Sequence, residues 1–336
     1  MADLDKEQRP KLLVVCGPTA SGKTSLSVSL AKLLDGEIIS ADSMQIYRGL
    51  DVGTAKITAA EMDGVPHHLV SICDPEIPFS VAEYVQLARQ KIEEITARGY
   101  LPILAGGTGL YISSLLSGLR FTQEEPLPGV RERLVAEAED LGADRMWQRL
   151  QQVDPETAAA IHPNNVKRVL RALEIFEQTG HTMSGQAAAS HPDTPPYDAL
   201  VIGLRFADRE LLYARIGQRV DQMLRQGLLD EAFLVYQNRE RYTTAAQAIG
   251  YKEFFPYFEN AAELTECIEE LKRASRRYAK RQLTWFGRMK EICWLQPDVS
   301  PDLTQEALEV IRQVGFSPCR TDFFGREGSA DEDDRI

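Results

Sequence analysis

A glycine-rich loop, GPTASGKT at residues 17–24, constrains this chain more than any other feature. It fits the pattern G-x-x-x-x-G-K-[ST], in which backbone N–H groups surround phosphate oxygens where a helix begins. The loop follows KLLVVC at 11–16, a continuous apolar run typical of a strand buried on both faces. Leucines at helical spacing predict the helix that must follow, and Gly36 stands where a glycine could end it. We therefore expect a parallel α/β sheet built around a phosphate site.

Four more segments are predicted to be strands of this sheet. The first ends in Asp42, which places a carboxylate at the edge where open α/β sheets bind ligands. The third contains Pro102, which removes one ladder donor, and enters a second glycine-rich turn that could face an anion. After the fourth we expect helices up to about residue 296 and no further strand. The segments are EIISAD at 37–42, HHLVSI at 67–72, YLPILAGGTGLY at 100–111 and ALVIGLRF at 199–206.

Helix signals divide the rest of the chain. Ser80 and Glu83 form an S-x-x-E capping box for a helix that Gly99 should end. Residues 122–195 have helical patterns throughout, and their best-defined helix follows Asn165 and stops before Gly180. The predicted fold is a P-loop NTPase-like α/β core with a parallel sheet and an inserted, mostly helical domain. The predicted divisions are 1–121 for the first part of the core, 122–195 for the insert, 196–325 for the rest of the core and 326–336 for a disordered acidic tail, with a linker at 186–198.

Composition limits the classes of function. The chain has 38 Lys and Arg against 50 Asp and Glu, and its net charge of −12 disfavours indiscriminate binding to polyanions. No run approaches the roughly 20 apolar residues that span a bilayer, and the polar N-terminus does not resemble a signal peptide, so we expect a cytoplasmic protein. The five cysteines lack a CxxC pair and are expected to be reduced thiols.

One stretch opposes the overall acidity. Residues 271–290 contain Lys and Arg but no acid. Basic groups grip phosphates and aromatic rings stack on unpaired bases, a combination used to bind single-stranded RNA. A solvated basic face is the ordinary alternative, and the same alternative holds for Lys167, Arg168 and Arg171 on the insert. The residues expected on one helical face are Arg273, Arg277, Lys280, Arg281, Thr284 and Arg288, with Tyr278, Trp285 and Phe286 nearby.

The phosphate loop assigns roles to its own side chains. In this motif the Lys23 ammonium neutralises terminal phosphates and the Thr24 hydroxyl binds Mg²⁺. Arg215 and Arg219 lie one helical turn apart, so both could address the same anion, or both could be solvated. The predicted diphosphate site comprises Gly17, Pro18, Thr19, Ala20, Ser21, Gly22, Lys23, Thr24, Arg215 and Arg219.

Three other candidates remain open from the residues alone. Asp42 could be a general base, a metal-associated carboxylate or the cap of the next turn. Thr108, in the GGTGLY turn, offers a hydroxyl near the phosphate, although such turns are common without a ligand. His67 and His68 lack the spacing of metal ligands and are better interpreted as core or capping residues.

Taken together, these motifs resemble the tRNA dimethylallyltransferases, also called tRNA isopentenyltransferases. Each stretch alone would be weak evidence for the family, but all of them occur in the family's order, from residue 13 to about 295, and that combination is specific to it. The matching stretches are GPTASGKT, ISADSMQIYRGLDVGTAK, GVPHHL, GGTGLYI, VDPETAAAIHPNNVKRVLRALEIF, the Arg215–Arg219 helix, AIGYKEF and AKRQLTWF.

The resemblance implies transfer of the dimethylallyl group from dimethylallyl diphosphate, with Mg²⁺, to N6 of the adenosine 3′ of the anticodon (position 37 of tRNA). Asp42 would activate the amine, Thr108 would orient the diphosphate, and Lys23 and Arg219 would stabilise its charge. The base must be flipped out of the anticodon loop to react. A monomer that binds the anticodon stem-loop is implied. The tRNA contacts so implied are Asp42, Ser43, Met44, Gln45, Thr108, Arg131, Lys167, Arg168, Val169, Leu170, Arg171, Gln247, Ala248, Ile249, Gly250, Tyr251, Lys252, Lys280, Arg281, Gln282, Leu283, Thr284, Trp285, Phe286 and Gly287.

Two rival functions share some of these features. A P-loop phosphotransferase acting on a nucleoside or small molecule would use the same loop, Mg²⁺ and an acceptor-side acid, and would turn over ATP. A non-catalytic RNA-binding module could carry a relict loop. The intact Lys23, Thr24 and Asp42 argue against that second alternative.

Overall fold

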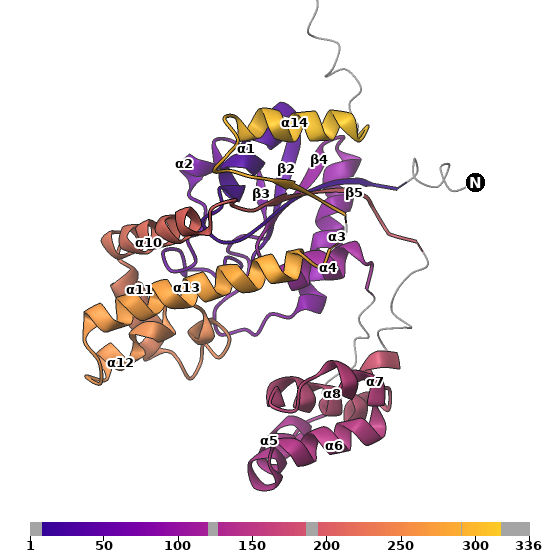
Figure 1. Ribbon diagram of the computed structural model, residues 1–336, viewed down its shortest axis with the longest axis vertical. Helices are drawn as coiled ribbons and strands as arrows, with labels where there is room; N and C mark the ends of the chain where they lie inside the picture. The colour runs from indigo at the N-terminus through magenta and orange to yellow at the C-terminus, as the bar shows by residue number, and fades with distance from the viewer. Residues whose placement is uncertain (1–8, 120–126, 186–193, 290, 317–336) are drawn as a thin grey trace, which may run out of the picture. The chain divides into compact units, whose positions relative to one another are not determined.

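The chain folds into two compact units in the computed structural model, which describes residues 9–119, 127–185, 194–289 and 291–316 (Figure 1). One unit comprises Met1–Leu116 with Pro196–Ile336, and the other comprises Ser117–Pro195. The predicted boundary at residue 122, the greater part of the predicted linker and the acidic tail at 326–336 lie outside the described residues.

A six-stranded sheet forms the centre of the first unit, with the order β3-β2-β4-β1-β5-β6. All its strand pairs are parallel, which confirms the prediction of a parallel α/β sheet. The inner strands are buried on both faces, as their continuous apolar runs predict. The strands are β1 (Lys11–Cys16), β2 (Gly36–Ala41), β3 (His67–His68), β4 (Leu101–Gly106), β5 (Asp198–Leu204) and β6 (Ile292–Leu295).

Two strand predictions were wrong. HHLVSI forms a strand only at its first two residues, because Leu69 and Ser71 adopt left-handed backbone with φ of 60° and 53°. ALVIGLRF is not the last strand, since β6 follows it and pairs with β5. The four residues of β6 are too few for a periodic signal after a long helical stretch.

The helices follow their predicted signals more closely. Ser80 and Glu83 form the expected capping box, and Gly99 after the helix has a φ of 81°. Asp208 caps α10 through the Glu210 N–H. The helices of this unit are α1 (Lys23–Leu33), α2 (Ala59–Met62), α3 (Val81–Ala97), α4 (Gly109–Leu116), α10 (Arg209–Arg225), α11 (Leu228–Gln237), α12 (Phe255–Phe258), α13 (Leu264–Phe286) and α14 (Leu303–Gln313), with 3₁₀ turns η1 (Ala245–Gln247) and η2 (Lys252–Phe254).

Gly36 does not end α1 as predicted. Asp35 takes the left-handed conformation instead, with a φ of 48°, and Gly36 opens β2. A Cβ on Gly36 would lie 2.7 Å from Ile103 Cδ1 and 3.0 Å from the Leu101 carbonyl oxygen. The glycine is therefore required by the close packing of β2 against β4 rather than by a turn.

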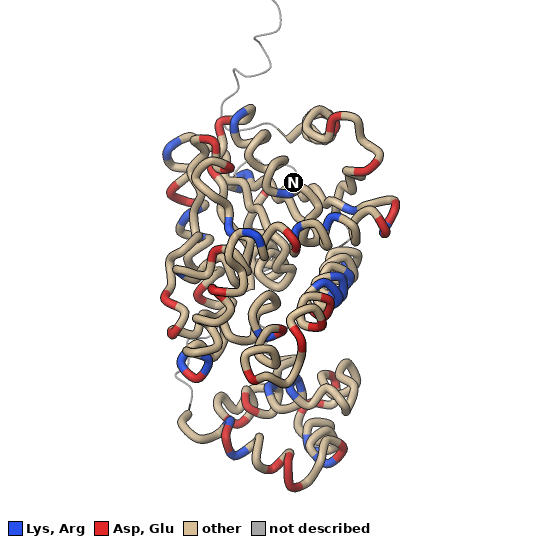
Figure 2. The backbone as a smooth tube through the Cα atoms, turned by 90° about the vertical axis from the view of Figure 1, so that its left-hand side faces the viewer, with Lys and Arg blue, Asp and Glu red and all other residues tan. Residues whose placement is uncertain are grey.

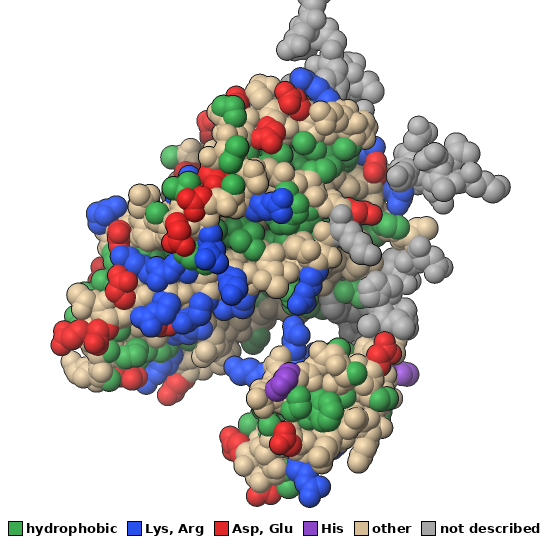
Figure 3. Space-filling view, in the orientation of Figure 1, with side chains coloured by type: hydrophobic (Ala, Val, Ile, Leu, Met, Phe, Trp, Pro, Cys, Tyr) green, Lys and Arg blue, Asp and Glu red, His purple; other side chains and the backbone are tan. Residues whose placement is uncertain are grey.

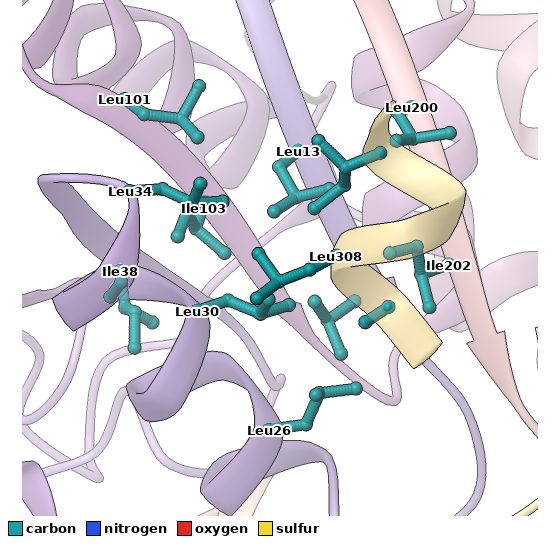
Figure 4. Close-up of a cluster of buried hydrophobic side chains, with 14 of the residues drawn as sticks. Leu13, Leu26, Leu30, Leu34, Ile38, Leu101, Ile103, Leu200, Ile202 and Leu308 are labelled. Carbon is teal, nitrogen blue, oxygen red and sulfur yellow. The ribbon is translucent and has the colours of Figure 1, made fainter. Parts of the chain in front are cut away.

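Helices cover both faces of the sheet. On one face α1 and α14 pack over Leu13, Ile103 and Ile202, with Leu30 and Leu308 meeting in the same cluster (Figure 4). On the other face α3 and α4 bury a second cluster, which also takes in Phe286 from the end of α13. A third cluster is formed by apolar residues of α10, α11 and α13 together with Ile46, Tyr47 and Leu50 of the segment after β2.

The second unit is helical. Its helices are α5 (Val130–Leu141), α6 (Ala143–Val153), α7 (Pro155–Ala160) and α8 (Val166–Thr179), and Gly180 ends α8 with a φ of 70°, as predicted. They bury a small core around Leu134, Leu150 and Leu173. Acidic and basic residues are interspersed over most of the backbone in both units (Figure 2).

Two compositional expectations can be compared with the described residues. Cys16, Cys73, Cys267 and Cys293 are free thiols, as expected, and Cys319 lies outside the described part. None of the helices in the described ranges combines the length and the hydropathy needed to cross a bilayer.

Glu37 gives the fold a pH-dependent contribution. Its carboxylate accepts bonds of 2.6 Å from both His68 Nε2 and Arg98. Burial raises the pKa of Glu37, but the bonds from Arg98 and His68 outweigh it, and the pKa lies below its ordinary value of 4.5. A depressed pKa stabilises the fold above about pH 4.5, and this contribution is lost as the pH falls through the folded-state value.

We therefore expect Glu37→Gln to lower the free energy of unfolding at pH 7 by about 1 to 3 kcal/mol. The difference from wild type should shrink below about pH 4, where the wild-type carboxylate is protonated too. Urea unfolding at the two pH values measures it. Glu309→Gln, at an exposed position on α14, is the control and should change little. An equal loss at both pH values would contradict the ionic contribution.

Candidate active site

A cavity of about 480 Å³ lies at the carboxyl ends of β1, β2 and β4, within the first unit. Residues that follow these three strands form one side of it, including Lys23, Asp42 and Gly107. The other side comes from α10 and α13, which contribute Arg219 and Arg281 among others. Strands that are adjacent and parallel bring their following loops to one edge, so this is where the predicted phosphate loop and acid meet.

The phosphate loop is folded ready for an anion. Ala20 and Gly22 have φ of 62° and 94°, and α1 begins directly after Gly22. Lys23 Nζ donates to the Pro18 carbonyl at 2.6 Å, and Thr24 lies on the cavity wall. Burial, followed by the nearby positive charge of Arg219, lowers the pKa of Lys23 to about 8, against the raising effect of Asp42. A bound anion would relieve this repulsion.

The two predicted arginines occupy different places. Arg219 lines the cavity, and burial lowers its pKa although the charge of Asp42 raises it. Arg215 is exposed and is not among the cavity-lining residues. Its Nε donates to the Ala20 carbonyl at 3.0 Å, and its guanidinium lies over the Phe206 ring. Arg219 can therefore meet an anion directly, whereas Arg215 buttresses the outer side of the loop.

Asp42 takes one of the three roles considered for it, that of a cap, and it lies in the cavity where the other two could be exercised. Its Oδ1 accepts from the Met44 and Gln45 N–H groups at 2.9 and 3.3 Å, so it caps the turn after β2. It also lines the cavity together with Ser43, Met44 and Gln45. Capping by one carboxylate oxygen fixes the direction of the other, which is what a positioned base needs.

Thr108 is tied to the same turn. Its N–H donates to the Ala41 carbonyl, and its Oγ1 accepts from the Ser43 N–H, both at 3.0 Å. Tyr278 of α13, one of the three aromatic residues expected near the basic face, lines the same cavity. Thr108 itself is not one of the lining residues, and its bonds join the GGTG turn to the end of β2 and the turn that follows it.

The glycines of the GGTG turn admit neighbouring elements at close range. A Cβ on Gly106 would lie 2.2 Å from the Ala41 carbonyl oxygen at the end of β2. A Cβ on Gly107 would lie 2.3 Å from Gln282 Nε2, and one on Gly109 would lie 2.3 Å from Trp285 Cδ1. Close packing against neighbouring elements therefore explains why these positions of the turn are glycine.

Gln282 joins α13 to both glycine-rich loops. Its Oε1 accepts from the Thr19 N–H of the phosphate loop at 2.9 Å, and its Nε2 donates to the Gly107 carbonyl at 3.0 Å. The side chain is 6% exposed. An amide is suited to this place because it offers one acceptor and two donors without charge. Sequence reasoning assigned Gln282 to RNA contact by resemblance and did not foresee this bridge.

Glu231 is a site-building residue that sequence reasoning missed. Its carboxylate accepts from three successive N–H groups, those of Asp51, Val52 and Gly53, at 2.7 to 2.9 Å. It also accepts from the Tyr251 hydroxyl at 2.8 Å. Gly53 lines the cavity, so this charge-assisted cap holds part of the wall. A lone Glu on a helix about 180 residues away carries no local signal for such a partnership.

The basic face of α13 is divided. Arg273 and Arg277 both pair with Glu270 of the same helix, whereas Arg281 lines the cavity and Lys280 is exposed beside it. Lys and Arg side chains gather over the stretch where Figure 1 draws α13 (Figure 3). No ion pair of Lys280 or Arg281 occurs among the described residues. These two are the α13 cations best placed to meet a polyanion.

Of the three aromatic residues expected near the basic face, burial contradicts base stacking by Phe286. Phe286 is 0% exposed and belongs to the core over α3 and α4, so its ring cannot stack on a base. Trp285 packs against Gly109 and the same core. Their spacing placed them near the basic face, but apolar bodies at the end of a helix are better buried against the sheet. Tyr278, which lines the cavity, is the aromatic side chain that α13 presents to the site.

The remaining residues of the implied tRNA surface divide by exposure. Ala248, Ile249, Gly250 and the exposed Gln247 and Lys252 line the cavity, but the Tyr251 side chain is buried beneath them. Leu283 packs in a small cluster with α10, and Thr284 and Gly287 are exposed.

On the second unit the implied contacts divide in the same way. Lys167 and Arg168 are exposed, Val169 is buried and Leu170 packs against the unit's core. Arg171 donates to Glu174 at 2.9 Å, and Arg131 lies 4.0 Å from the same carboxylate. Arg171 is exposed too, but Lys167 and Arg168 are the exposed cations of this helix without an ion pair among the described residues.

A family model described as IPP transferase matches residues 45–289. The chain is 50% identical over 311 residues to a tRNA dimethylallyltransferase of Bacillus cytotoxicus, covering 93% of this chain and 96% of that protein. It is also 50% identical over 303 residues to the tRNA dimethylallyltransferase of Bacillus subtilis, covering 90% and 95%.

Solved structures show the same similarity. The crystal structure of a tRNA isopentenylpyrophosphate transferase from Bacillus halodurans matches with a TM-score of 0.68 at 46% identity, covering 91% of this chain and 96% of that chain. A eukaryotic dimethylallyltransferase described as acting on tRNA matches with a TM-score of 0.77 at 30% identity, covering 96% and 81%.

The close approach of Gly106 to β2 generates a prediction for stability. Gly106→Ala should lower the free energy of unfolding by at least about 2 kcal/mol, because its Cβ would meet backbone atoms that cannot rotate away. Gly217 lies inside α10, where an added Cβ would have no neighbouring atom within 4 Å, and it is the matched control. Gly217→Ala should raise the free energy of unfolding by about 0.5 to 1 kcal/mol. Urea unfolding compares the two, and similar changes in both would contradict the packing argument.

Proposed function

The chain belongs to the IPP transferase family, and from this we propose that its cavity transfers a dimethylallyl group from dimethylallyl diphosphate to N6 of the adenosine 3′ of the anticodon. It is a tRNA prenyltransferase. The observation that carries the proposal for this site is the convergence of the phosphate loop, Asp42 and the basic end of α13 on one cavity. One wall suits a diphosphate, another offers a base for the acceptor, and the third is suited to RNA.

The diphosphate is proposed to bind to the loop at the start of α1. Backbone N–H groups of residues 17–24, the Lys23 ammonium and the Arg219 guanidinium would hold its oxygens. Lys23 would exchange its bond to the Pro18 carbonyl for bonds to phosphate. Burial lowers the pKa of both cations, and the negative charge that grows on the leaving group would be stabilised by groups already in place.

Mg²⁺ fits this site through the Thr24 hydroxyl, which lies on the cavity wall at the position that binds the metal in such loops. Within the described ranges no group of three His, Cys, Asp or Glu side chains could hold a metal by itself. Diphosphate oxygens and water would complete the coordination, as Mg²⁺ prefers. When bound, the metal would neutralise charge on the departing diphosphate.

The acceptor amine is proposed to meet Asp42. The N6 lone pair forms the new C–N bond to the first carbon of the dimethylallyl group, the C–O bond to diphosphate breaks, and the carboxylate takes the N6 proton. Diphosphate leaves with the electron pair of the broken bond. Tyr278 and Arg281 of α13, which line the cavity, would meet the flipped base and the phosphate backbone beside it.

The tRNA is proposed to be gripped through its phosphates. Lys280 and Arg281 of the first unit and Lys167 and Arg168 of the second are exposed or cavity-lining cations without an ion pair among the described residues. Such local cations overcome the net charge of −12 at short range. We propose that the protein acts on the anticodon stem-loop as a monomer in the cytoplasm.

Phosphotransfer to a small acceptor would use many of the same groups. Incubation with Mg²⁺, unmodified tRNA and either dimethylallyl diphosphate or ATP separates the two functions. Nucleoside mass analysis should show a dimethylallyl adduct of adenosine with the first donor. Phosphate transfer from ATP without a prenyl adduct would overturn the proposal.

We expect Asp42→Asn to slow transfer by about 10² to 10⁴, the usual cost of losing a general base. Asparagine keeps an oxygen that can cap the Met44 and Gln45 N–H groups, so the turn should persist. Single-turnover transfer and tRNA affinity are measured side by side. The affinity for tRNA should stay within about tenfold of that of wild type, which is roughly the contribution of one hydrogen bond. A rate near that of wild type would exclude Asp42 as the base.

Neutralising either basic cluster should weaken binding to many tRNAs and lower the salt slope by about 0.7 to 0.9 per lost phosphate contact. The clusters are Lys167 with Arg168, and Lys280 with Arg281, each changed to Ala as a pair. A double variant at Arg225 and Arg239, two exposed arginines of the first unit, controls for charge alone. Affinity measured against salt concentration gives the slopes. Slopes equal to that of the control would show that the clusters are merely solvated.

A further inference from the structure

The hydroxyl of Ser27 is buried in the cavity wall and has no partner in the described part of the chain. The residue is 1% exposed and lines the cavity, yet no donor or acceptor there bonds its Oγ. A serine within a helix can bond the carbonyl of an earlier turn, and Ser27 does not. Because an unpaired buried hydroxyl is destabilising, its presence in a ligand cavity points to a partner that arrives with the ligand.

The position of Ser27 relates it to the phosphate loop. It follows Lys23 and Thr24 by four and three residues in α1, so the three side chains share one face of the helix. The floor opposite is the sheet, where Ile38 and Ser40 of β2 line the cavity in alternation and Asp42 continues the series. Ser27 therefore lies one helical turn after Thr24, the proposed metal ligand, and lines the same cavity as Ser40 and Asp42.

The chemistry of the proposed ligand supplies a suitable partner. Mg²⁺ takes six oxygen ligands and keeps several waters, because it dehydrates reluctantly. The loop offers the Thr24 hydroxyl, and the described residues hold no acidic cluster to replace the waters. Each metal-bound water has protons to donate, and a serine oxygen has lone pairs that can accept them. A dimethylallyl chain could not satisfy this hydroxyl, so the hydrocarbon is excluded as the partner.

We propose that Ser27 is a positioning residue for the metal–diphosphate group, its Oγ accepting a hydrogen bond from a water bound to Mg²⁺. The inference rests on the proposed function, since the diphosphate and its metal are the ligands of that reaction. Ser27 breaks and forms no covalent bond. It fixes the orientation of the hydrated metal, and thereby of the diphosphate, relative to the sheet floor that ends in Asp42.

The test uses inorganic pyrophosphate, the product of the proposed reaction, with the full-length chain. Calorimetry measures its affinity for wild type and Ser27→Ala, once with Mg²⁺ and once with EDTA. Ser300→Ala is the matched control, because Ser300 also has a buried hydroxyl without a partner among the described residues but does not line the cavity. Thermal unfolding of the ligand-free proteins shows what each hydroxyl costs when unpaired.

With Mg²⁺ present, Ser27→Ala should bind pyrophosphate about threefold to tenfold more weakly than wild type, the loss of one hydrogen bond. Ser300→Ala should bind as wild type does. Without Mg²⁺ the Ser27 variant and wild type should be equal. Both variants should keep or raise the ligand-free melting temperature, by about 1 to 3 °C, since each loses an unpaired polar group.

Two results would overturn the inference. Wild-type affinity of Ser27→Ala in Mg²⁺ would show that the hydroxyl meets no part of the ligand. An equal loss with and without Mg²⁺ would place the hydroxyl on phosphate or on the fold rather than on metal-bound water. Failure of the proposed function looks different, because wild type itself would then bind no pyrophosphate with Mg²⁺ and transfer no prenyl group.

Discussion

Parallel pairing of β2 with β4 and of β4 with β1 is the constraint on which the site depends. It aligns the ends of three strands at one edge, so the phosphate loop, the Asp42 turn and the GGTG turn meet although about 90 residues separate the first from the last. The pairing is tight enough that β2 and β4 meet through glycines at both ends, Gly36 and Gly106. The relative positions of the three loops are therefore fixed by the backbone of the sheet.

The sequence predicted the parts of this arrangement that depend on interactions between residues close together in the chain. The apolar run before GPTASGKT, the capping box at Ser80 and the terminal glycine at Gly99 all involve neighbours within a few residues, and all were confirmed. Asp42 was placed at the correct strand end for the same reason. The left-handed residues Leu69 and Ser71 were not foreseen, because neither residue type favours positive φ and only tertiary contacts impose it.

Partners far apart in sequence account for the rest. The sequence around Glu231 does not predict that its carboxylate accepts from the N–H groups of residues 51–53. The sequence around Gln282 likewise does not predict its bond with the Thr19 N–H. Burial decided against Phe286 as an RNA contact for the same reason, since a helical face is known from spacing but the element packed against it is not. Resemblance to a family could point to these residues without saying what each one holds.

The bridge made by Gln282 places adjacent residues of α13 against the phosphate loop and in the cavity. The residue before it in the chain, Arg281, reaches into the cavity, while Gln282 itself holds a phosphate-loop amide and the Gly107 carbonyl. A displacement of α13 by an incoming polynucleotide would therefore act directly on the phosphate loop, through the bond between Gln282 and Thr19. A fragment made of the sheet and the phosphate loop alone would lack α13. The Thr19 N–H would then lose its acceptor on Gln282, and Gly107 and Gly109 would lose the side chains that pack against them.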